Sequence, residues 1–232
     1  MKTRCQSMVG ELKTVLMQHL EKAYKNEASL KSQWSDLNYL EKPKLSKSIV
    51  DYNYFVNLVS KAGTTVEFLP ESDKTGLDSL YTHDPAVVTN RGVILCNMGK
   101  DARKGESGAV EDYCNQNGLP ILGKITPPGT LEGGDVLWID EKTVAVGEGY
   151  RTNSEGIRQF YELLSDGVDE VIPVPLPHWT GPTDCLHLLS NVSPVDHDLY
   201  VVYSPLLTVP FRNYLLKRGI QLIEVPEKEY ST

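Results

Sequence analysis

The chain has 232 residues, of which 40% are hydrophobic and 23% charged, a composition typical of a single globular domain. Its 31 aspartates and glutamates outnumber its 23 lysines and arginines, and the net charge of −8 argues against nucleic acid as the main partner. No stretch approaches the length of a membrane span, and the start lacks the apolar core of a secretory signal. We therefore expect a cytoplasmic protein with no membrane partner and one domain over 1–232.

The first predicted unit is incomplete. A strand at Leu12–Met17 leads through a long polar loop to a helix near Ser46–Ala62, which Gly63 ends, and a strand at Thr65–Leu69 follows. The unit provides no partner for its first strand. In the loop, Trp34–Tyr39 could be a lid over a pocket or a packed surface segment.

Three complete units follow, each with the order strand, tight turn, strand, amphipathic helix, glycine, strand. Their strands are predicted at 86–88, 93–96 and 121–125, at 136–139, 143–147 and 171–174, and at 187–192, 199–203 and 221–225. The first of their helices covers about 103–117, and the second presents an apolar face of Ile157, Phe160, Tyr161 and Leu164. The glycines expected to end the helices in the left-handed conformation are Gly63, Gly118, Gly167 and Gly219.

Repeated units of about 50 residues predict a ring or solenoid of supersecondary modules. A conventional doubly wound α/β sheet explains the alternation of strands and helices, but not the hairpin before each helix. A ring must close, because open strand edges promote aggregation. The unpartnered first strand therefore predicts a ring with a missing segment.

The segment Leu131-Glu132-Gly133-Gly134-Asp135 places two carboxylates across a glycine pair, directly before an apolar strand. Glycine allows a tight bend and a close approach of another group. Asp84 precedes another strand in the same way, and His187 lies at the start of a third hairpin. Two acids and a histidine at such positions predict a pocket for a guanidinium.

The cysteines and histidines do not form a metal-binding pattern. Cys5, Cys96, Cys114 and Cys185 lack CxxC spacing, which favours free buried thiols over disulfides or zinc. The histidines do not have the spacing of zinc ligands either. No metal or cofactor is predicted.

Five short motifs, in this order, resemble those of the guanidino-group-modifying enzymes of the pentein fold. They are Asp78 with His83-Asp84-Pro85, Arg103-Lys104-Gly105-Glu106, Glu132-Gly133-Gly134-Asp135, Arg151-Thr152-Asn153 and Leu186-His187-Leu188-Leu189-Ser190. The family includes dimethylarginine dimethylaminohydrolases, arginine deiminases and amidinotransferases. The resemblance implies an α/β fold, a β/α propeller of five ββαβ modules around a pseudo-fivefold axis, with the C-terminal module missing from this chain.

The resemblance also implies roles for individual residues. Asp84 and Glu132 would bind the substrate guanidinium, and His187 would be the general acid and base. Arg103 and Arg151 would hold the substrate α-carboxylate. Asp78 and Asp135 would complete the substrate-binding set.

Two departures from the family pattern bear on the substrate. Leu189 stands where deiminases and amidinotransferases usually carry an aspartate, which favours the dimethylarginine enzymes. His83 stands where those enzymes often carry an acid, so the exact guanidino substrate is left open.

A third departure concerns the nucleophile, which in the family is a cysteine of the last module. Cys185, two residues before His187, is the nearest substitute, but a buried thiol is the better interpretation. We expect the nucleophilic cysteine beyond Thr232.

The implied function is a hydrolase that cleaves the guanidinium of arginine or an N-methylated arginine to citrulline and an amine, through a cysteine thiouronium intermediate. An amidinotransferase and an arginine deiminase are alternatives within the family. A non-catalytic pentein-fold binding protein and an inactive fragment are alternatives outside it. The expected partner is a small cationic guanidino compound, and a homodimer is left open.

Overall fold

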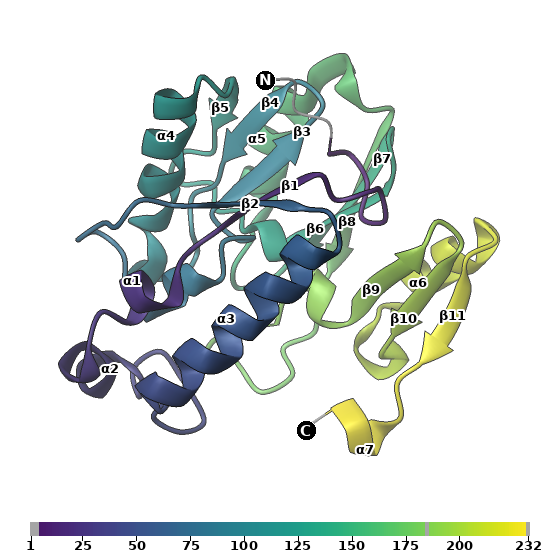
Figure 1. The fold of residues 1–232 in the computed structure, drawn as a ribbon. Coiled ribbons are helices and arrows are strands. Elements are labelled where there is room, and N and C mark those ends of the chain that lie inside the picture. The colour runs from purple at the N-terminus through teal and green to yellow at the C-terminus, as the bar shows by residue number, and fades with distance from the viewer. Residues whose placement is uncertain (1–4, 184–185, 231–232) are drawn as a thin grey trace.

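The computed structural model describes residues 5–183 and 186–230, which form four small sheets about a common centre (Figure 1). The strands are β1 (Thr14–Met17), β2 (Thr65–Phe68), β3 (Ala86–Thr89), β4 (Gly92–Leu95), β5 (Ile121–Lys124), β6 (Val136–Asp140), β7 (Thr143–Glu148), β8 (Glu170–Pro175), β9 (Val192–Asp196), β10 (Leu199–Val202) and β11 (Gln221–Glu224). The helices are α1 (Leu20–Tyr24), α2 (Glu27–Gln33), α3 (Leu45–Lys61), α4 (Glu106–Asn117), α5 (Ser154–Leu164), α6 (Val209–Lys217) and α7 (Glu227–Tyr230). Single 3₁₀ turns are η1 (Leu77–Leu80), η2 (Asp101–Arg103), η3 (Gly133–Asp135), η4 (Ser165–Gly167), η5 (Leu188–Ser190) and η6 (Ser204–Leu206).

Three sheets repeat one topology. Strands β3 and β4, β6 and β7, and β9 and β10 form antiparallel hairpins. After each hairpin the chain crosses through a helix and returns as a parallel strand, β5, β8 or β11, beside the second hairpin strand. The predicted repeating unit is therefore confirmed, and each hairpin brings the residues before its first strand toward the centre.

The first unit differs from the prediction that its first strand has no partner. Strand β1 has a partner, because it pairs in parallel with β2 through the crossover that contains α3. It therefore corresponds to the second hairpin strand of the other units. Within the described parts of the chain, no strand pairs with the opposite edge of β1.

The helix ends follow the glycine prediction at three of four places. Gly63, Gly118 and Gly219 have φ of 94°, 63° and 79°, the left-handed region that favours glycine. Gly167 does not, because α5 ends at Leu164 and Ser165 takes the positive φ, 49°.

Two predicted boundaries and one predicted face were wrong. The strand expected from His187 begins only at Val192, because His187 caps the 3₁₀ turn η5. Helix α4 begins at Glu106, since the preceding residues form the separate turn η2. Tyr161 is 55% exposed, although the other residues of the predicted apolar face are buried.

The segment 34–39 is packed rather than a free lid. Trp34, Leu37 and Tyr39 pack on a cluster formed by residues of α1, α2 and η1, among them Leu30 and Leu77. The interpretation as a packed surface segment is confirmed, and the loop is anchored before β2 begins.

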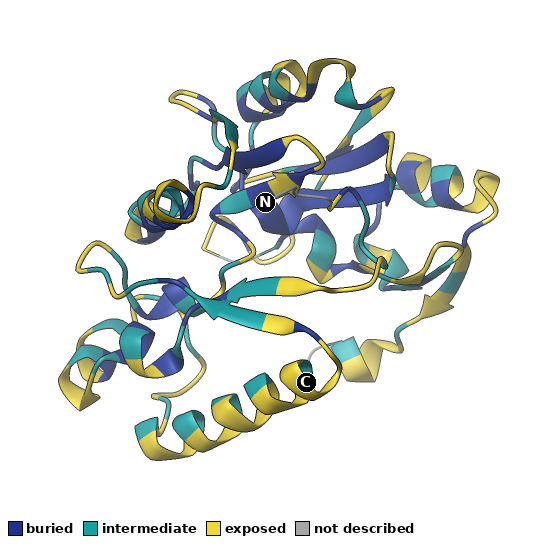
Figure 2. Cartoon of the chain, turned by 45° about the horizontal axis from the view of Figure 1, so that its top comes forward, coloured by how far each residue is buried: buried dark blue, intermediate teal, exposed yellow. Residues whose placement is uncertain are grey.

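The main core lies on the two faces of β6. Val136 and Trp138 point into one apolar cluster, which includes Phe160 of α5, while Leu137 and Ile139 point into a second one beneath β9–β11. A strand that is buried on both faces is expected to be continuously apolar, as this one is. Figure 2 shows the buried residues gathered in these strands.

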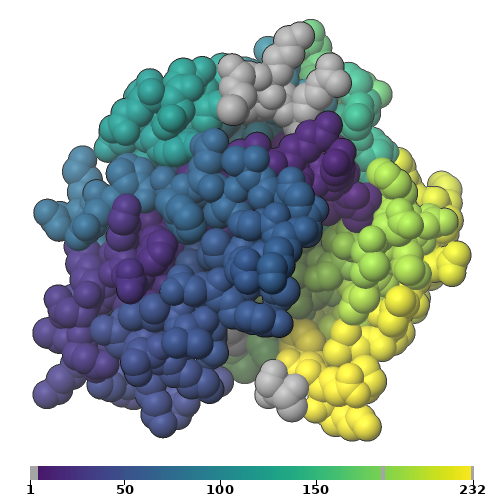
Figure 3. Space-filling model, in the orientation of Figure 1, coloured from purple at the N-terminus to yellow at the C-terminus, as the bar shows by residue number. Residues whose placement is uncertain are grey.

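Helix α3 contrasts with this core, because none of its residues is buried (Figure 2). Val50, Tyr54, Phe55 and Leu58 are each at least 47% exposed. Figure 3 shows the surface hollowed between α3 and the C-terminal elements. Within the described ranges, no helix is both long and apolar enough to span a bilayer.

Candidate active site

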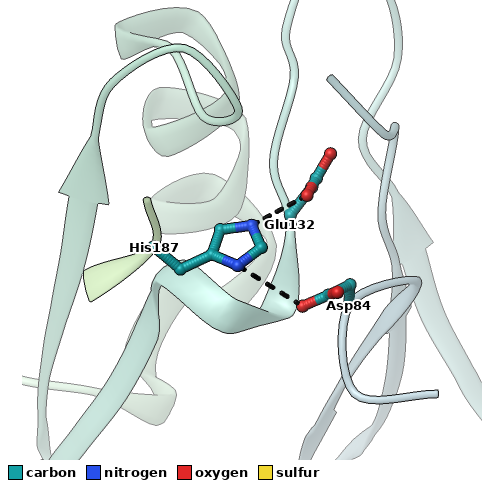
Figure 4. A group of neighbouring side chains, drawn as sticks. All are labelled: Asp84, Glu132 and His187. Atoms are coloured by element: carbon teal, nitrogen blue, oxygen red, sulfur yellow. Dashed lines mark hydrogen bonds and ion pairs between the residues drawn. The ribbon is translucent and has the colours of Figure 1, made fainter. Parts of the chain in front are cut away.

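Asp84, Glu132 and His187 meet at the centre of the molecule. Each lies shortly before the hairpin of its own unit, with η3 between Glu132 and β6 and η5 between His187 and β9, so corresponding segments of three units supply the three side chains. One ligand atom from each lies within 4.8 Å of the other two, and all three residues are buried. Figure 4 shows the imidazole of His187 between the two carboxylates.

Glu132 is the most tightly held member of this group. Its Oε2 lies 2.8 Å from Nε2 of His187 and 3.4 Å from the Arg151 guanidinium, and its Oε1 accepts the backbone N–H groups of Gly99 (2.9 Å) and Lys100 (3.1 Å). Burial opposes ionisation of Glu132. The hydrogen bond with His187 and the nearby positive charges outweigh burial and lower its pKa to about 2. Glu132 is therefore a fixed anion.

Asp84 is held by a second arginine. Its Oδ2 lies 2.5 Å from Arg103, its Oδ1 accepts the Gly134 N–H at 3.0 Å, and Nδ1 of His187 lies 3.9 Å from Oδ1. A carboxylate has about four acceptor positions, so Asp84 retains capacity for further donors. It can accept the N–H groups of a cationic ligand while keeping its arginine.

Arg103 is almost completely enclosed. Only 3% of its surface is exposed, and its guanidinium also pairs with both carboxylate oxygens of Glu106, at 3.0 and 2.7 Å. Its remaining nitrogen contacts are the carbonyl oxygens of Asp78 and Tyr81. The predicted role of Arg103 and Arg151 as partners of a substrate carboxylate stays a prediction, and these contacts favour support of the two acids instead.

Asp135 connects the third unit to the fourth. Its carboxylate accepts the Thr152 hydroxyl at 2.6 Å and the Leu188 N–H at 2.9 Å, and it is fully buried. Burial raises the pKa of Asp135 to about 6. Because Leu188 follows His187, this contact fixes the backbone that carries the imidazole.

The described cysteines lie away from this arrangement or inside the core. Cys96 and Cys114 are buried free thiols, whereas Cys5 is exposed, contrary to the prediction. Burial raises the pKa of Cys96 well above its usual range, which keeps the thiol protonated. Cys185 lies outside the described residues.

Comparison with known proteins gives this site its family context. The arginine deiminase family model matches residues 77–230. The chain belongs to the arginine deiminase family. Among curated relatives, the dimethylarginine dimethylaminohydrolase of Pseudomonas aeruginosa is 25% identical over 83% of this chain and 70% of its own length. An uncharacterised protein of Aeropyrum pernix is 34% identical over 84% of this chain and 68% of its own length.

Solved structures show that this arginine deiminase family chain has the pentein β/α propeller fold. A mutant of the Pseudomonas aeruginosa dimethylarginine dimethylaminohydrolase, complexed with citrulline, superposes with a TM-score of 0.74 at 23% identity, over 95% of this chain and 79% of that one. An amidinotransferase from Microseira wollei superposes with a TM-score of 0.74 at 15% identity, over 97% of this chain and 76% of that one. The predicted superfamily is confirmed.

The three central side chains are also close enough to share one cation. Arg103 and Arg151 already place positive charge against Asp84 and Glu132. A divalent ion at this position would meet repulsion from both guanidinium groups, stronger than a singly charged cation would meet.

Sequence reasoning gave no role to Lys100, to the turn at Gly99, or to Thr152, although Thr152 lies in the predicted motif Arg151-Thr152-Asn153. Thr152 donates to Asp135 and accepts the Glu132 N–H, so it links the two acids of the glycine motif. Gly99 and Lys100 lie on the link after β4 and cap Glu132 through their backbone. For Gly99 and Lys100 the available signal was the Gly-Lys pair shortly before Arg103.

Gly134→Ala is expected to disrupt the site. A Cβ at Gly134 would lie 2.4 Å from Nδ1 of His187 and 2.8 Å from Asp84 Oδ1, so the imidazole must move. Overpacking of this kind costs about 1–3 kcal/mol of folding free energy. Gly108→Ala is the matched control, because nothing lies within 4 Å of its Cβ and it is inside α4. Urea unfolding should show that Gly108→Ala is neutral or stabilising by up to about 1 kcal/mol, and equal losses in both variants would contradict the packing argument.

Proposed function

We propose that this site binds the guanidinium of arginine or an N-methylated arginine, within an amidino hydrolase that releases citrulline and an amine. The observation that carries the proposal is the buried imidazole between two carboxylates. Five acids, Asp78, Asp84, Glu106, Glu132 and Asp135, and three cations, Lys100, Arg103 and Arg151, surround the imidazole. Burial raises the pKa of Glu106 to about 7 and that of Asp135 to about 6, so Asp84 and Glu132, which face His187, are the acids that can attract a cationic ligand.

The groups present match the needs of the reaction. A guanidinium is a planar fork of N–H donors, and resonance makes its carbon a poor electrophile. Asp84 and Glu132 can orient it, and the gain in rate comes from aligning the carbon with a thiolate. The thiolate forms a C–S bond, the C–N bond to the amine breaks, and His187 donates the proton to the leaving nitrogen.

The second half of the reaction uses the same imidazole in reverse. His187, now neutral, takes a proton from water as the oxygen attacks the thiouronium carbon. The C–S bond breaks, and the ureido group of citrulline is released with regeneration of the thiolate.

We propose that the nucleophilic cysteine lies beyond Thr232, in a further module of the same propeller domain. The unpaired edge of β1 and the exposed apolar side chains of α3 support this, because such surfaces are normally covered. The P. aeruginosa relatives named above are covered over 70–79% of their own length. The intact mass of the naturally expressed protein tests directly whether the chain continues beyond Thr232.

Leu189 bears on which member of the family this is. It packs, partly buried, against the apolar cluster under β9–β11. An apolar side chain used in this way cannot act as an acid or an acceptor. This favours the dimethylarginine reaction over the deiminase and amidinotransferase alternatives.

Isothermal calorimetry on the 232-residue chain tests the binding part of the proposal. L-arginine and N-methylated arginines should bind, whereas lysine, which has an ammonium in place of the guanidinium, should bind at least about tenfold more weakly. No heat with any guanidino compound, together with binding to a macromolecule, would favour a non-catalytic pentein-fold protein.

Citrulline release by the naturally expressed protein tests the catalytic part of the proposal. It should depend on His187, since His187→Gln removes the proton donor and should reduce turnover by about 10²–10⁴-fold. If the naturally expressed protein bound arginine but released no citrulline, the proposal of a hydrolase would be refuted and a binding protein would remain.

A further inference from the structure

Lys100 occupies a position that the reaction described above does not use. Its Nζ lies 2.8 Å from Oδ2 of Asp78 and 3.3 Å from the carbonyl oxygen of Leu37. Its side chain is 19% exposed, whereas those of Arg103 and Arg151 are 3% and 6% exposed. Of the three cations around the site, Lys100 is thus the most open to a ligand.

A chain of contacts connects Lys100 to the three central side chains and to Arg103. Its backbone N–H donates to Glu132, and Glu132 contacts His187. His187 approaches Asp84, and Asp84 pairs with Arg103. Arg103 donates to the carbonyl of Asp78, whose carboxylate returns to the ammonium of Lys100. These contacts form a continuous network that begins and ends at Lys100, so its ammonium belongs to the same site as the imidazole.

The length of the lysine side chain matches that of an arginine ligand. Five bonds separate Cα of Lys100 from its Nζ, and five bonds separate the guanidinium carbon of free arginine from its Cα, on the order of 6 Å in each case. The backbone N–H of Lys100 contacts Glu132, and the ammonium at the other end of its side chain contacts Asp78. An arginine whose guanidinium is held by Glu132 and Asp84 can therefore run alongside Lys100 and place its α-groups near the ammonium.

We propose that Lys100 is the residue that makes the site specific for guanidino compounds with an anionic far end, because it binds the substrate carboxylate. This inference rests on the proposed function and deepens it. An ammonium has three donors, and two of those of Lys100 are directed at the Asp78 carboxylate and the Leu37 carbonyl oxygen. The third is available for a carboxylate, and the free capacity of Asp78 can accept the substrate α-ammonium beside it.

The Leu37 contact gives this arrangement its rigidity. The carbonyl of Leu37 belongs to the packed segment 34–39, so that segment and Asp78 together fix the position of the Lys100 ammonium. A donor that is already oriented loses less side-chain entropy when a ligand binds.

The test compares two ligands that share the guanidinium and differ at the far end, L-arginine and its decarboxylated analogue agmatine. By calorimetry, the wild-type chain should bind arginine at least about tenfold more tightly than agmatine. Lys100→Gln should weaken arginine binding by about tenfold and change agmatine binding by less than about twofold. Lys100→Arg, which keeps the charge, should restore part of the arginine affinity.

Lys104→Gln is the matched control. Lys104 also lies between β4 and α4, but its side chain is 58% exposed and pairs with Asp101, away from the central residues. It should change neither affinity, and thermal unfolding of each variant shows whether the fold is kept.

Three outcomes have distinct meanings. Equal loss of arginine and agmatine in Lys100→Gln would overturn the specificity role and indicate a structural one. Equal affinity of the wild type for both ligands would overturn it without any variant. Binding of neither ligand by the wild type would refute the proposed function itself, and this inference with it.

Discussion

Replacing Glu132 with glutamine is expected to abolish guanidinium binding and to lower the free energy of unfolding by about 3–5 kcal/mol. Glutamine keeps the size and one carbonyl oxygen, which can still accept the N–H groups of Gly99 and Lys100. It removes the negative charge beside the Arg151 guanidinium, which is 6% exposed. An uncompensated buried cation is among the largest single-residue penalties.

Glu155→Gln is the control for this prediction. Glu155 pairs with Arg158 on the outer face of α5, where solvent screens the interaction. Urea unfolding should leave its stability essentially unchanged, and calorimetry should show normal arginine binding. If Glu132→Gln binds arginine as well as Glu155→Gln does, Glu132 is not a guanidinium ligand.

The stability difference between the wild type and Glu132→Gln should depend on pH in a defined direction. The pKa of Glu132 is lowered to about 2 in the folded chain, against an ordinary value of 4.5 for a glutamate. A lowered acid pKa stabilises the folded state above the unfolded value and loses that effect as pH falls toward the folded value. The difference should therefore be complete above about pH 4.5 and shrink by about 3 kcal/mol as pH falls toward 2.

Asp135 contributes with the opposite sign, since burial raises its pKa to about 6. Its ionised form destabilises the fold, so this cost is removed as pH falls below about 6. Both proteins contain Asp135, and the burial that chiefly raises its pKa is common to them, so this part of its contribution cancels in their difference. The charge of Glu132 also raises the pKa of Asp135, and this smaller part is lost in Glu132→Gln. A difference that stays constant from pH 7 to pH 3 would show that the Glu132 carboxylate is not specially stabilised.

The fold was largely predictable because its signals are local. A turn ending in Gly92 and a left-handed Gly118 mark the boundaries of a unit regardless of the rest of the chain. The convergence of Asp84, Glu132 and His187 could also be anticipated, since the three hold equivalent positions in successive units. Because the units repeat, the position of a residue within its own unit was enough to predict which side chains meet in the tertiary structure.

The ionic partners could not be predicted in this way. Arg103 lies 3 residues before one carboxylate partner and 19 after the other, so only the packed structure shows that one guanidinium serves both. The Gly-Lys pair before Arg103 did not indicate a role for Lys100, because its contact with Asp78 depends on how η1 packs against that turn. Tyr161 fits the helical period but lies at the solvent edge of the apolar face, because burial of α5 is limited by the sheet it covers.

Arg103→Ala is expected to lower the free energy of unfolding by about 3–5 kcal/mol, because Asp84 and Glu106 would lose their shared buried cation. The two explanations of Arg103 then differ in their binding results. If it held the substrate carboxylate, its loss would weaken arginine and spare agmatine. If it positions Asp84, as its enclosure favours, both ligands should weaken together.

Free guanidinium provides a second measurement, because Arg103→Ala leaves a cavity lined by carboxylates that has the shape of the lost group. Millimolar guanidinium, well below denaturing concentrations, should raise the melting temperature of this variant by mass action. It should have no such effect on Arg158→Ala, since Arg158 pairs with Glu155 and Glu162 at the exposed surface of α5. A selective effect on Arg103→Ala would show that these buried carboxylates can bind a guanidinium that is not part of the chain. Because Asp84 belongs to both this pair and the proposed substrate site, the variant measures the chemistry on which the function depends.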